Sequence, residues 1–591
     1  MTRFSVPSTE PVRTIQITQF TGANLNPDQT QLAAGESPDM LNIILDDDGT
    51  PDKRTGYEAG FASLGATPIR GMVRYRDWIV FSQGGRLFRW RPSLVPAQIF
   101  TGIADTKMRG FVFDDLLYIL NGSQFLVYDN ATVVPVVPHI PTLTISTPPT
   151  GGGTALDDWN LIGTGFRQNF NGNGSATVYQ LVQTGLAATT VIAQVNGATI
   201  TEGSGLTVNR TTGAVTFSVA PSTGINNVQI VAHRVFAGLP DRILRCTNFN
   251  IFGGNNDTRV HLFGNPDFPS ITRQSGTNNP TYWPENAFNR YGSSDNSIVS
   301  KVNQYDTSVV FKEDSIWLET IDFNEVGSPI FPNKPINSSM GCIAADSVQL
   351  LDNNPVFLTR EGVMMLTSSQ VRDERNVQLL SEKINSDLLT RDLQHAISAE
   401  FDNMYILVLP GGFAWVYHYR LGAWFPWNNF NFDCMMVWGQ DLFLGGKTGV
   451  IFRLKRITDQ LPYNDAGQPI LAHWSTKMYG FDSEAYQKMI RTLHVTLRPG
   501  VSTYADVYLR SDRRSLWRYL TKFGSTLFSY KNLDYSTFTY NCRFLPRARA
   551  RKIKAKRVVY FQLRFENPDN DSNMGLLFLA LHFTIQREVR R

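Results

Sequence analysis

The residues of this chain best suited to binding chemistry are cations gathered near its C-terminus. Residues 547–557 read RARARKIKAKR, so seven of these eleven positions are basic. The seven are Arg547, Arg549, Arg551, Lys552, Lys554, Lys556 and Arg557. A positive surface of this kind meets DNA phosphates or an acidic partner. A solubilising loop or a charged edge strand is the alternative interpretation of the same run.

The spacing of these cations predicts an extended strand with two basic faces. In such a strand Arg547, Arg549 and Arg551 share one face, and Lys552, Lys554 and Lys556 share the other. The alternation changes sides at Arg551-Lys552, where a β-bulge or a turn would explain it. Aromatic residues do not interleave with the cations, so we expect neither sequence-specific nor single-strand nucleic-acid binding.

Catalytic and metal-binding patterns are missing from the sequence. There is no GxSxG or HExxH motif, the eight His are scattered, and the four Cys are far apart without a CxxC pair. The sequence therefore predicts no enzyme, no cofactor and no metal site. Asp46-Asp47-Asp48-Gly49 has the composition of a calcium loop, but its alternation is wrong, and an acidic β-turn is the better interpretation.

Aromatic residues cluster between Trp415 and Phe430, where a carbohydrate platform or a packed core would both be possible. Core and inter-blade packing is the interpretation we favour. The cluster comprises Trp415, Tyr417, Tyr419, Trp424, Phe425, Trp427 and Phe430.

The composition is that of a large, all-β, globular protein. At 591 residues we expect two to four domains, and 42% hydrophobic content excludes a disordered chain. The 12% aromatic content and the many Gly, Asn, Thr and Ser residues favour short strands with tight turns. The sequence shows no signal peptide and no membrane-spanning segment. The separated cysteines indicate buried thiols from a reducing compartment.

A unit of about forty residues recurs from Ile69 onward, which is the period of a propeller blade. Its parts are a strand, a tight polar turn, a strand, a Gly turn and another strand, as in 69–90 and 108–128. Later copies begin at Arg242, where Asn-Phe-Asn is expected to form the turn, and at Lys301, Cys342, Ala399 and Cys434. We count six or seven units, so the sequence predicts a β-propeller.

Two regions differ from the repeat. A Pro/Gly/Thr linker begins at Pro138, and 154–237 is rich in Thr, Val, Asn and Gly with hairpin signals, which predicts a small inserted β-sandwich. The C-terminal part has long alternating strands at 490–497, 505–510, 558–565 and 576–586, which predict a second sandwich. The expected domains are an N-terminal arm (1–68), the propeller (69–145 and 238–467), the insert (146–237) and the C-terminal sandwich (468–591).

One helix is expected among these strands. Residues 379–393 place Ile384, Leu388 and Leu389 at helical spacing after Ser381, which would serve as the N-cap.

Three segments resemble one family. Residues 26–57 contain several turn residues and end with Lys-Arg-x-Gly-Tyr. This pattern is similar to the N-terminal segment of bacteriophage tail hub and nozzle proteins. That family is also called tail tubular or DNA-stabilisation proteins. The matching residues are Leu32, Gly35, Glu36, Pro38, Asn42, Asp46, Gly49, Lys53, Arg54, Gly56 and Tyr57. The Leu380-to-Ile384 segment and the set Lys556, Phe561, Gln562, Arg564 and Asn567 resemble the same family.

This resemblance implies a structural protein of a phage virion tail, assembled in the host cytoplasm. It implies a homo-oligomeric ring, which we expect to be a hexamer, placed below the portal and adaptor and attached to other tail proteins and fibres. It also implies a conduit for double-stranded DNA that is passed without sequence specificity. The net charge of only +4 is compatible with a wall along which DNA slides. A baseplate or tail-tip protein of a long-tailed phage and a carbohydrate-binding or carbohydrate-degrading propeller are the alternatives.

Overall fold

The chain is almost entirely β-structure. The computed structural model describes residues 11–46, 49–254, 258–325, 327–368, 375–481, 483–528, 539–540 and 545–589. These residues form two compact units, of which the first comprises 1–69 and 343–591 and the second comprises 70–342. Among the described residues no helix is long and apolar enough to cross a membrane.

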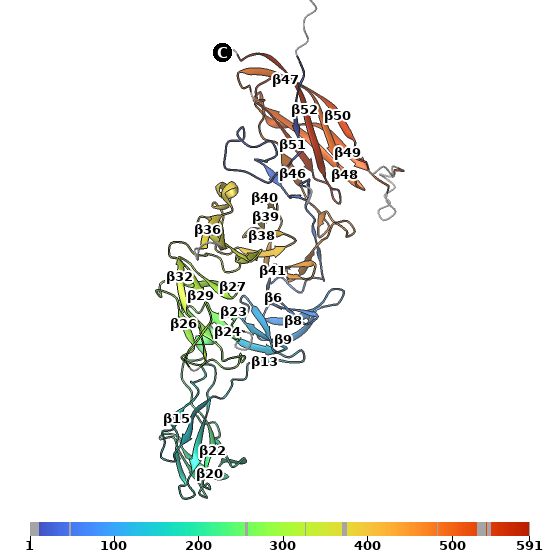
Figure 1. Ribbon diagram of the computed structural model, residues 1–591. Helices are drawn as coiled ribbons and strands as arrows, with labels where there is room; N and C mark the ends of the chain where they lie inside the picture. The colour runs from blue at the N-terminus through green and yellow to red at the C-terminus, as the bar shows by residue number, and fades with distance from the viewer. Residues whose placement is uncertain are drawn as a thin grey trace, which may run out of the picture. The chain divides into compact units, whose positions relative to one another are not determined.

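Seven four-stranded antiparallel sheets follow the order of the chain and form the blades of a β-propeller (Figure 1). This confirms the predicted fold class. Four blades belong to the second unit, except that Ile69 at the start of β6 is assigned to the first. The first two blades are β6 (Ile69–Tyr75), β7 (Trp78–Gln83), β8 (Arg86–Trp90) and β9 (Ala97–Thr101), followed by β10 (Arg109–Phe113), β11 (Leu116–Leu120), β12 (Phe125–Tyr128) and β13 (Val133–Pro135). The next two are β23 (Asn248–Phe252), β24 (Arg259–Phe263), β25 (Ile271–Gln274) and β26 (Phe288–Arg290), followed by β27 (Ile298–Gln304), β28 (Thr307–Lys312), β29 (Ile316–Glu319) and β32 (Asn333–Asn337).

The other three blades belong to the first unit. They are β33 (Gln349–Leu351), β34 (Asn354–Thr359), β35 (Gly362–Ser368), β36 (Arg375–Leu379); β37 (Ile397–Phe401), β38 (Met404–Leu409), β39 (Phe413–His418), β40 (Ala423–Trp427); β41 (Phe432–Trp438), β42 (Asp441–Gly446), β43 (Ile451–Leu454), β5 (Tyr57–Ala59). Short two-stranded pairs are β3 (Ile43–Leu45) with β4 (Pro51–Lys53), β30 (Asp322–Phe323) with β31 (Pro329–Ile330), and β44 (Asn464–Asp465) with β45 (Gln468–Pro469).

The first hairpin of several blades is made by two consecutive acidic or amide residues in the left-handed conformation. A two-residue turn of this type matches the twist of the flanking strands, and Asp and Asn tolerate the positive φ that it requires. The pairs are Asp114-Asp115, Asp352-Asn353 and Asp402-Asn403. The polar turns seen in the sequence therefore have a defined conformational role in the blades.

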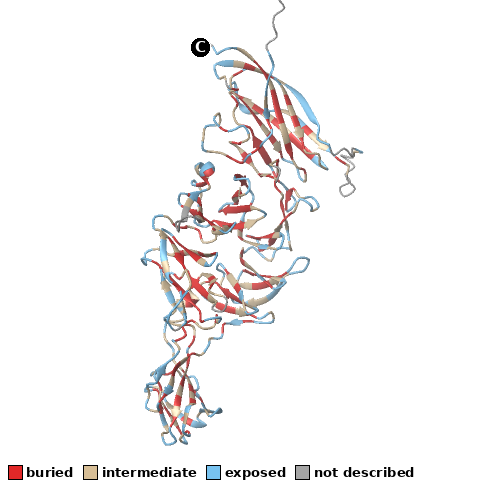
Figure 2. Cartoon of the chain, viewed as in Figure 1, coloured by how far each residue is buried: buried red, intermediate tan, exposed pale blue. Residues whose placement is uncertain are grey.

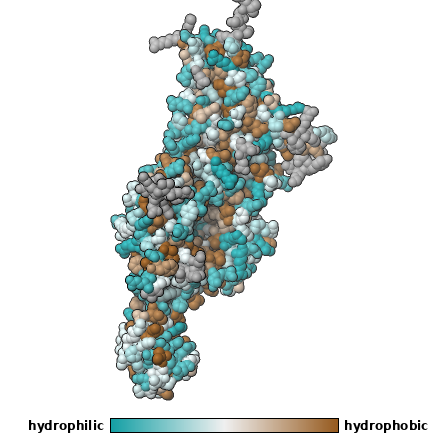
Figure 3. Space-filling model, viewed as in Figure 1, coloured by the Kyte–Doolittle hydropathy of each residue, from teal (hydrophilic) through white to brown (hydrophobic). Residues whose placement is uncertain are grey.

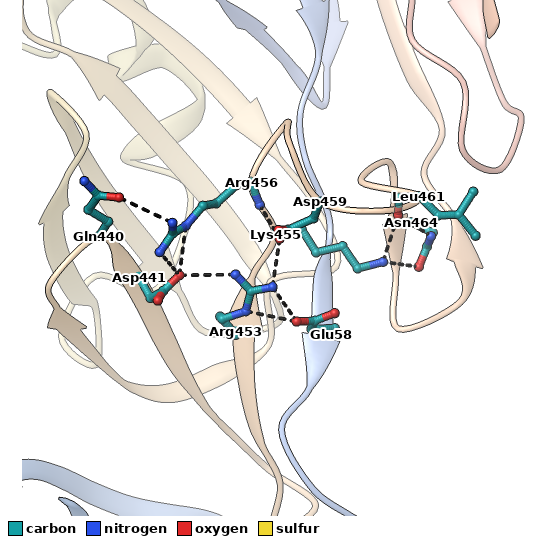
Figure 4. Close-up of polar contacts among 9 residues, drawn as sticks. All are labelled: Glu58, Gln440, Asp441, Arg453, Lys455, Arg456, Asp459, Leu461 and Asn464. Atoms are coloured by element: carbon teal, nitrogen blue, oxygen red, sulfur yellow. Dashed lines mark hydrogen bonds and ion pairs between the residues drawn. The ribbon is translucent and has the colours of Figure 1, made fainter. Parts of the chain in front are cut away.

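The last blade is completed by a strand from the N-terminal segment. β5 pairs antiparallel with β43, so Leu454 lies opposite Tyr57. Arg453 of β43 donates hydrogen bonds to Glu58 of β5, to Asp441 of β42 and to Asp459 (Figure 4). Side-chain ion pairs thus reinforce the backbone pairing between these distant parts of the chain.

The insert is a nine-stranded sheet with its own core in the second unit. Its strands are β14 (Thr142–Thr147), β15 (Thr154–Ala155), β16 (Gly165–Gly172), β17 (Val178–Gln180), β18 (Ile192–Val195), β19 (Ala198–Glu202), β20 (Gly205–Asn209), β21 (Ala214–Phe217) and β22 (Gly224–His233). Phe166, Phe170 and Tyr179 are among its fully buried residues. Its visible face in Figure 3 is mostly hydrophilic or neutral, with some apolar spots. Ile225 is one of the exposed apolar residues of the insert.

The boundaries of the insert differ from those predicted. β14 begins at Thr142 and pairs with β16, so the insert starts before residue 146. In addition, Asn160 and Leu161 return to the blade formed by β23 to β26. Asn160 donates to the carbonyls of His139 and Thr281 and accepts from the Trp283 amide, and Leu161 is packed in the blade core. The amino-acid composition indicated the insert, but it did not indicate that Asn160 and Leu161 contact the blade.

The C-terminal sandwich contains two sheets, and both include a strand from the N-terminal segment. One sheet has the order β1 (Arg13–Ile17), β52 (Leu576–Glu588), β47 (Tyr486–Leu497), β50 (Ala548–Val558). The other has the order β2 (Met40–Leu41), β46 (Ala472–Ser475), β51 (Phe561–Asn567), β48 (Ser502–Ser511), β49 (Arg514–Thr526). Buried residues occur along the strands of both sheets (Figure 2), and those of the two sheets belong to one hydrophobic core.

Several sequence predictions about these elements are wrong. Residues 1–68 are not a separate arm, because β1, β2 and β5 enter three different sheets. The expected strand 558–565 is divided, since β50 ends at Val558 and β51 begins at Phe561. The expected turn at 248–250 lies within β23, where the Asn250 amide is satisfied by Asn303 and Ser308.

The expected helix over 379–393 is reduced to η1 (Glu382–Ile384) and α2 (Asn385–Leu388), and the only other helix among the described residues is α1 (Asp241–Leu244). Ser381 is not a side-chain cap: its hydroxyl accepts from the Val363 amide and donates to Asn385. Asn, Ser and Asp at 385–387 are weak helix formers, and local side-chain bonds compete with the helix.

Asn160 provides a test of the contact between insert and blade. We expect Asn160→Ala to lower the stability of the second unit by about 1–3 kcal/mol, because it leaves buried backbone groups without partners. Thermal unfolding of the purified protein would measure this. Asn173→Ala, which removes an exposed turn residue at the insert, is the matched control and should have little effect. Equal melting temperatures for the two variants would contradict the structural role given to Asn160.

Candidate interface on the C-terminal sandwich

The 26–57 segment is a structural junction within the first unit. Arg54 is almost fully buried, and all five of its N–H groups have acceptors. Its guanidinium forms a bidentate ion pair with Asp465 at 2.9 and 2.7 Å. Its Nε donates to Asn42 at 2.9 Å, and the remaining bonds go to the carbonyls of Thr55 and Asn428.

Neighbouring residues extend this junction to the sandwich. The Lys53 ammonium donates to the Asp569 carbonyl at 2.6 Å and to the Asn567 side chain at 3.3 Å. Burial and the nearby charge of Arg54 lower the pKa of Lys53 to about 8. Arg564 donates to Asp39 at 2.7 Å, and His473 also contacts this carboxylate. Burial alone would raise the pKa of Asp39, but His473 and Arg564 lower it to about 2.

Of the three segments that resemble the tail family, the first contacts each of the other two. Glu36 binds Lys383 at 2.9 Å, which joins the first segment to the second. Lys53 binds Asn567, which joins the first segment to the third. Residues that are hundreds of positions apart in sequence therefore belong to one connected arrangement in the first unit.

Asp46 lies in a turn, as the sequence predicted for the acidic run. Its carboxylate accepts from the Thr50 amide at 2.8 Å, its carbonyl accepts from the Gly49 amide, and it pairs with Arg498. Asp47 and Asp48 lie outside the described residues. No group of three His, Cys, Asp or Glu side chains in the described part of the chain is placed to hold a metal ion.

The basic run forms the edge strand β50, except that Arg547 precedes it by one residue. All seven cationic residues are exposed, and within the described residues none of their side chains forms an ion pair. Ala548 to Lys552 pair with Thr496 to Thr492 of β47 in unbroken register. Register shifts follow, and Lys554 and Arg557 have φ values of 56° and 57°. The expected irregularity therefore exists but lies beyond Lys552.

The arginines and the lysines of this strand differ in orientation. Arg549 lies opposite Val495 and Arg551 opposite Leu493, which are core residues. Opposite residues in an antiparallel pair point to the same side of the sheet, so these arginines are on the side that faces the second sheet. Lys552 lies opposite Thr492 and is on the outer side. The sequence predicted two faces but not which one turns inward.

The cluster most similar to a catalytic arrangement is a buried one. In the second unit, Lys301 contacts Glu319 and lies 2.8 Å from His261 Nδ1, and all three side chains are completely buried. Burial and the charges of Lys301 and Arg259 hold the pKa of His261 well below its ordinary value. His261 thus lies beside an interior ion pair, and none of the three side chains is exposed to a substrate.

The aromatic cluster of 415–430 belongs to the core. Trp415, Trp424 and Trp427 are each no more than 2% exposed, and Phe425 and Phe430 are fully buried. Rings in this state cannot form a carbohydrate platform on the surface. The thiols of Cys246, Cys342 and Cys434 are buried as well, whereas Cys542 lies outside the described residues.

The Arg54–Asp465 pair should carry much of the stability of the first unit. We expect Asp465→Asn to destabilise it by about 3–5 kcal/mol, because a buried guanidinium loses its counter-charge. The exposed pair Arg70–Asp105 is the control, and Asp105→Asn should cost no more than about 1 kcal/mol. Chemical denaturation of the two variants would measure the difference. Similar losses of unfolding free energy in the two variants would contradict the larger contribution assigned to the buried pair.

Reversing charges on β50 should leave the fold intact. We expect the triple variant Arg549→Glu, Arg551→Glu, Lys554→Glu to have a free energy of unfolding within about 0.5 kcal/mol of that of the wild type. The reason is that these side chains are exposed and form no ion pair with a described residue. Lys488→Glu on β47 is the contrast. Lys488 is buried and donates to the Gly480 and Val559 carbonyls, so this variant should unfold at a lower temperature. A large loss in the triple variant would assign β50 a structural role instead.

No family model matches the chain, and no curated protein matches it. Several solved structures similar to it are β-propeller proteins. BamB from Moraxella catarrhalis has 10% identity and a TM-score of 0.34, with 69% of this chain and 99% of that chain covered. YCF48 bound to D1 peptide has 9% identity and a TM-score of 0.34, covering 71% and 99%. Sqt1 of Saccharomyces cerevisiae has 9% identity and a TM-score of 0.33, covering 68% and 98%.

Proposed function

We propose that this protein is a structural subunit of a bacteriophage tail, a hub or nozzle that assembles into a ring below the portal and adaptor. The ring encloses a conduit for double-stranded DNA, helps to retain the packaged genome, and anchors fibres or the tail tip. Its work is done by protein interfaces and geometry. We expect six copies in the ring, a count that comes from the family resemblance.

The observation that carries this proposal is the contact among the three family-like segments. Glu36 with Lys383 and Lys53 with Asn567 join residues from all three. A chance match to a pattern has no reason to bring its separate parts together in space. The contacts support treating the resemblance as a property of one shared architecture, which includes a propeller, a sandwich and the N-terminal segment that links them within the first unit.

The charges of the chain suit a conduit and an assembly surface better than a DNA-gripping surface. A net charge of +4 on 591 residues does not lead us to expect strong binding along the whole molecule. Seven cations without an ion pair among the described residues lie together at Arg547 and along β50, where a partner would neutralise them. We therefore assign β50 to a contact in the assembled tail.

Electron microscopy would test the proposal. We expect the purified protein to form rings with six-fold symmetry and to be found at the tail of purified virions. Virions carrying the triple reversal on β50 should assemble poorly or lose DNA, although the subunit itself stays folded. A protein that stays monomeric, is absent from virions, and cleaves a polysaccharide through one essential carboxylate would support the carbohydrate-degrading alternative instead.

A further inference from the structure

The regular half of β50 borders a pocket at the open edge of the sandwich. The pocket has a volume of about 70 Å³ and is lined by residues of β47, β49 and the start of β50. Val495, Leu497 and Phe523 form its apolar lining. Arg547, Arg549 and the 81% exposed Leu545 form its basic and outer lining. The core of the sandwich thus opens toward solvent beside a row of arginines.

The backbone of the same strand offers unused hydrogen-bonding groups. β50 is the last strand of its sheet, and within the described residues it pairs only with β47. From Ala548 to Lys552 its register is unbroken, so one backbone edge of this stretch is available to a further strand. The bulges at Lys554 and Arg557 interrupt that edge farther along.

The charges on this edge have no ion-pair partner among the described residues. None of Arg547, Arg549 and Arg551 forms an ion pair with a described residue, whereas Arg453 and Arg54 bind carboxylates. Arginines at alternate positions face one side, and the small residues Ala548 and Ala550 face the other. An incoming strand would therefore meet cations on one side and little obstruction on the other.

We infer that this edge of the sandwich binds an acidic, extended segment of a partner protein, which adds to β50 as a further strand. Acidic side chains at alternate positions would lie opposite Arg549 and Arg551, and an apolar side chain would enter the pocket beside Leu545. This deepens the proposed function at the same strand and rests only on β50 being an interface.

Double-stranded DNA fits these features less well than an acidic peptide. Its phosphates would meet the cations, but the backbone edge and the apolar side chains at the base of the pocket would have no role. A peptide strand uses the edge, the arginines and the pocket together, since it supplies backbone donors and acceptors, carboxylates and an apolar group.

The experiment compares two fluorescent peptides of equal length and charge. One alternates Glu with Val, carries one terminal Leu on its Glu face to enter the pocket, and pairs as a strand; the other has Pro in place of every Val and does not. Anisotropy titrations with the full chain should show the Glu-Val peptide binding at least about ten-fold more tightly, because only it forms backbone hydrogen bonds. In its complex, amide exchange should slow across 548–552.

Two charge-matched variants locate the site. Arg549→Glu with Arg551→Glu changes the inward face, and Lys552→Glu with Lys556→Glu makes the same change in net charge elsewhere on the strand. The first pair should weaken binding of the Glu-Val peptide by about ten-fold or more, and the second by less than about three-fold. Arg549→Gln with Arg551→Gln, which adds no negative charge, should give an intermediate loss. Unchanged melting temperatures would confirm that all of these variants fold.

Three results would overturn the inference. They are an absence of binding of the Glu-Val peptide, equal binding of both peptides, or equal losses in the two Glu variants, since each indicates at most a diffuse attraction for anions. A short DNA duplex that binds without slowing amide exchange and displaces the peptide would assign the strand to phosphate. If the protein binds the peptide but is absent from virions, the proposed function is overturned and this inference stands. If the protein is found in virion tails but does not bind the peptide, only this inference is overturned.

Discussion

The first unit depends on satisfying one buried ion pair. Arg54 and Asp465 are both nearly excluded from water, and such a pair is tolerable only when every donor and acceptor around it is matched. This requirement brings together the N-terminal segment, the loop after β40 and the β44 hairpin. Asn42 adopts a positive φ of 53° and accepts from Arg54, and Gly56 lies so close to Asn464 that a Cβ atom would be 1.8 Å from its carbonyl oxygen.

The position of Arg54 in turn determines how the last blade and the sandwich are completed. Three residues later Tyr57 begins β5, which is the fourth strand of that blade, and its ring contacts Phe430, Phe432 and Phe452. On the other side, Lys53 reaches the sandwich. Both connections join residues separated by several hundred positions, so this unit cannot be completed until the last strands are made, and its folding should be slow for its size.

The sequence predicted features whose cause is local and missed those whose cause is distant. Blade hairpins were readable because their turns need residues that accept a positive φ, as at Asp402-Asn403. The basic strand was readable from its alternation. Its inward face was not, because that depends on pairing Arg549 with Val495 across a break of more than fifty residues. The sheets that β1 and β2 join were not predicted for the same reason, and Asn160 returns to its blade through contacts that composition does not reveal.

Arginines at core-facing positions of the edge strand β50 have two effects on the sandwich: they keep charge at its open edge, and they limit which strands can pair with that edge. Their long side chains keep the charged groups in water although they lie opposite the core residues Val495 and Leu493, whereas leucine at the same positions would expose apolar surface. They also limit which strands can pair there. Two copies of β50 placed edge to edge would oppose cation to cation, and like charges in directly opposite positions are destabilising. The strand is therefore protected against self-association through this edge and remains available only to a partner of opposite charge.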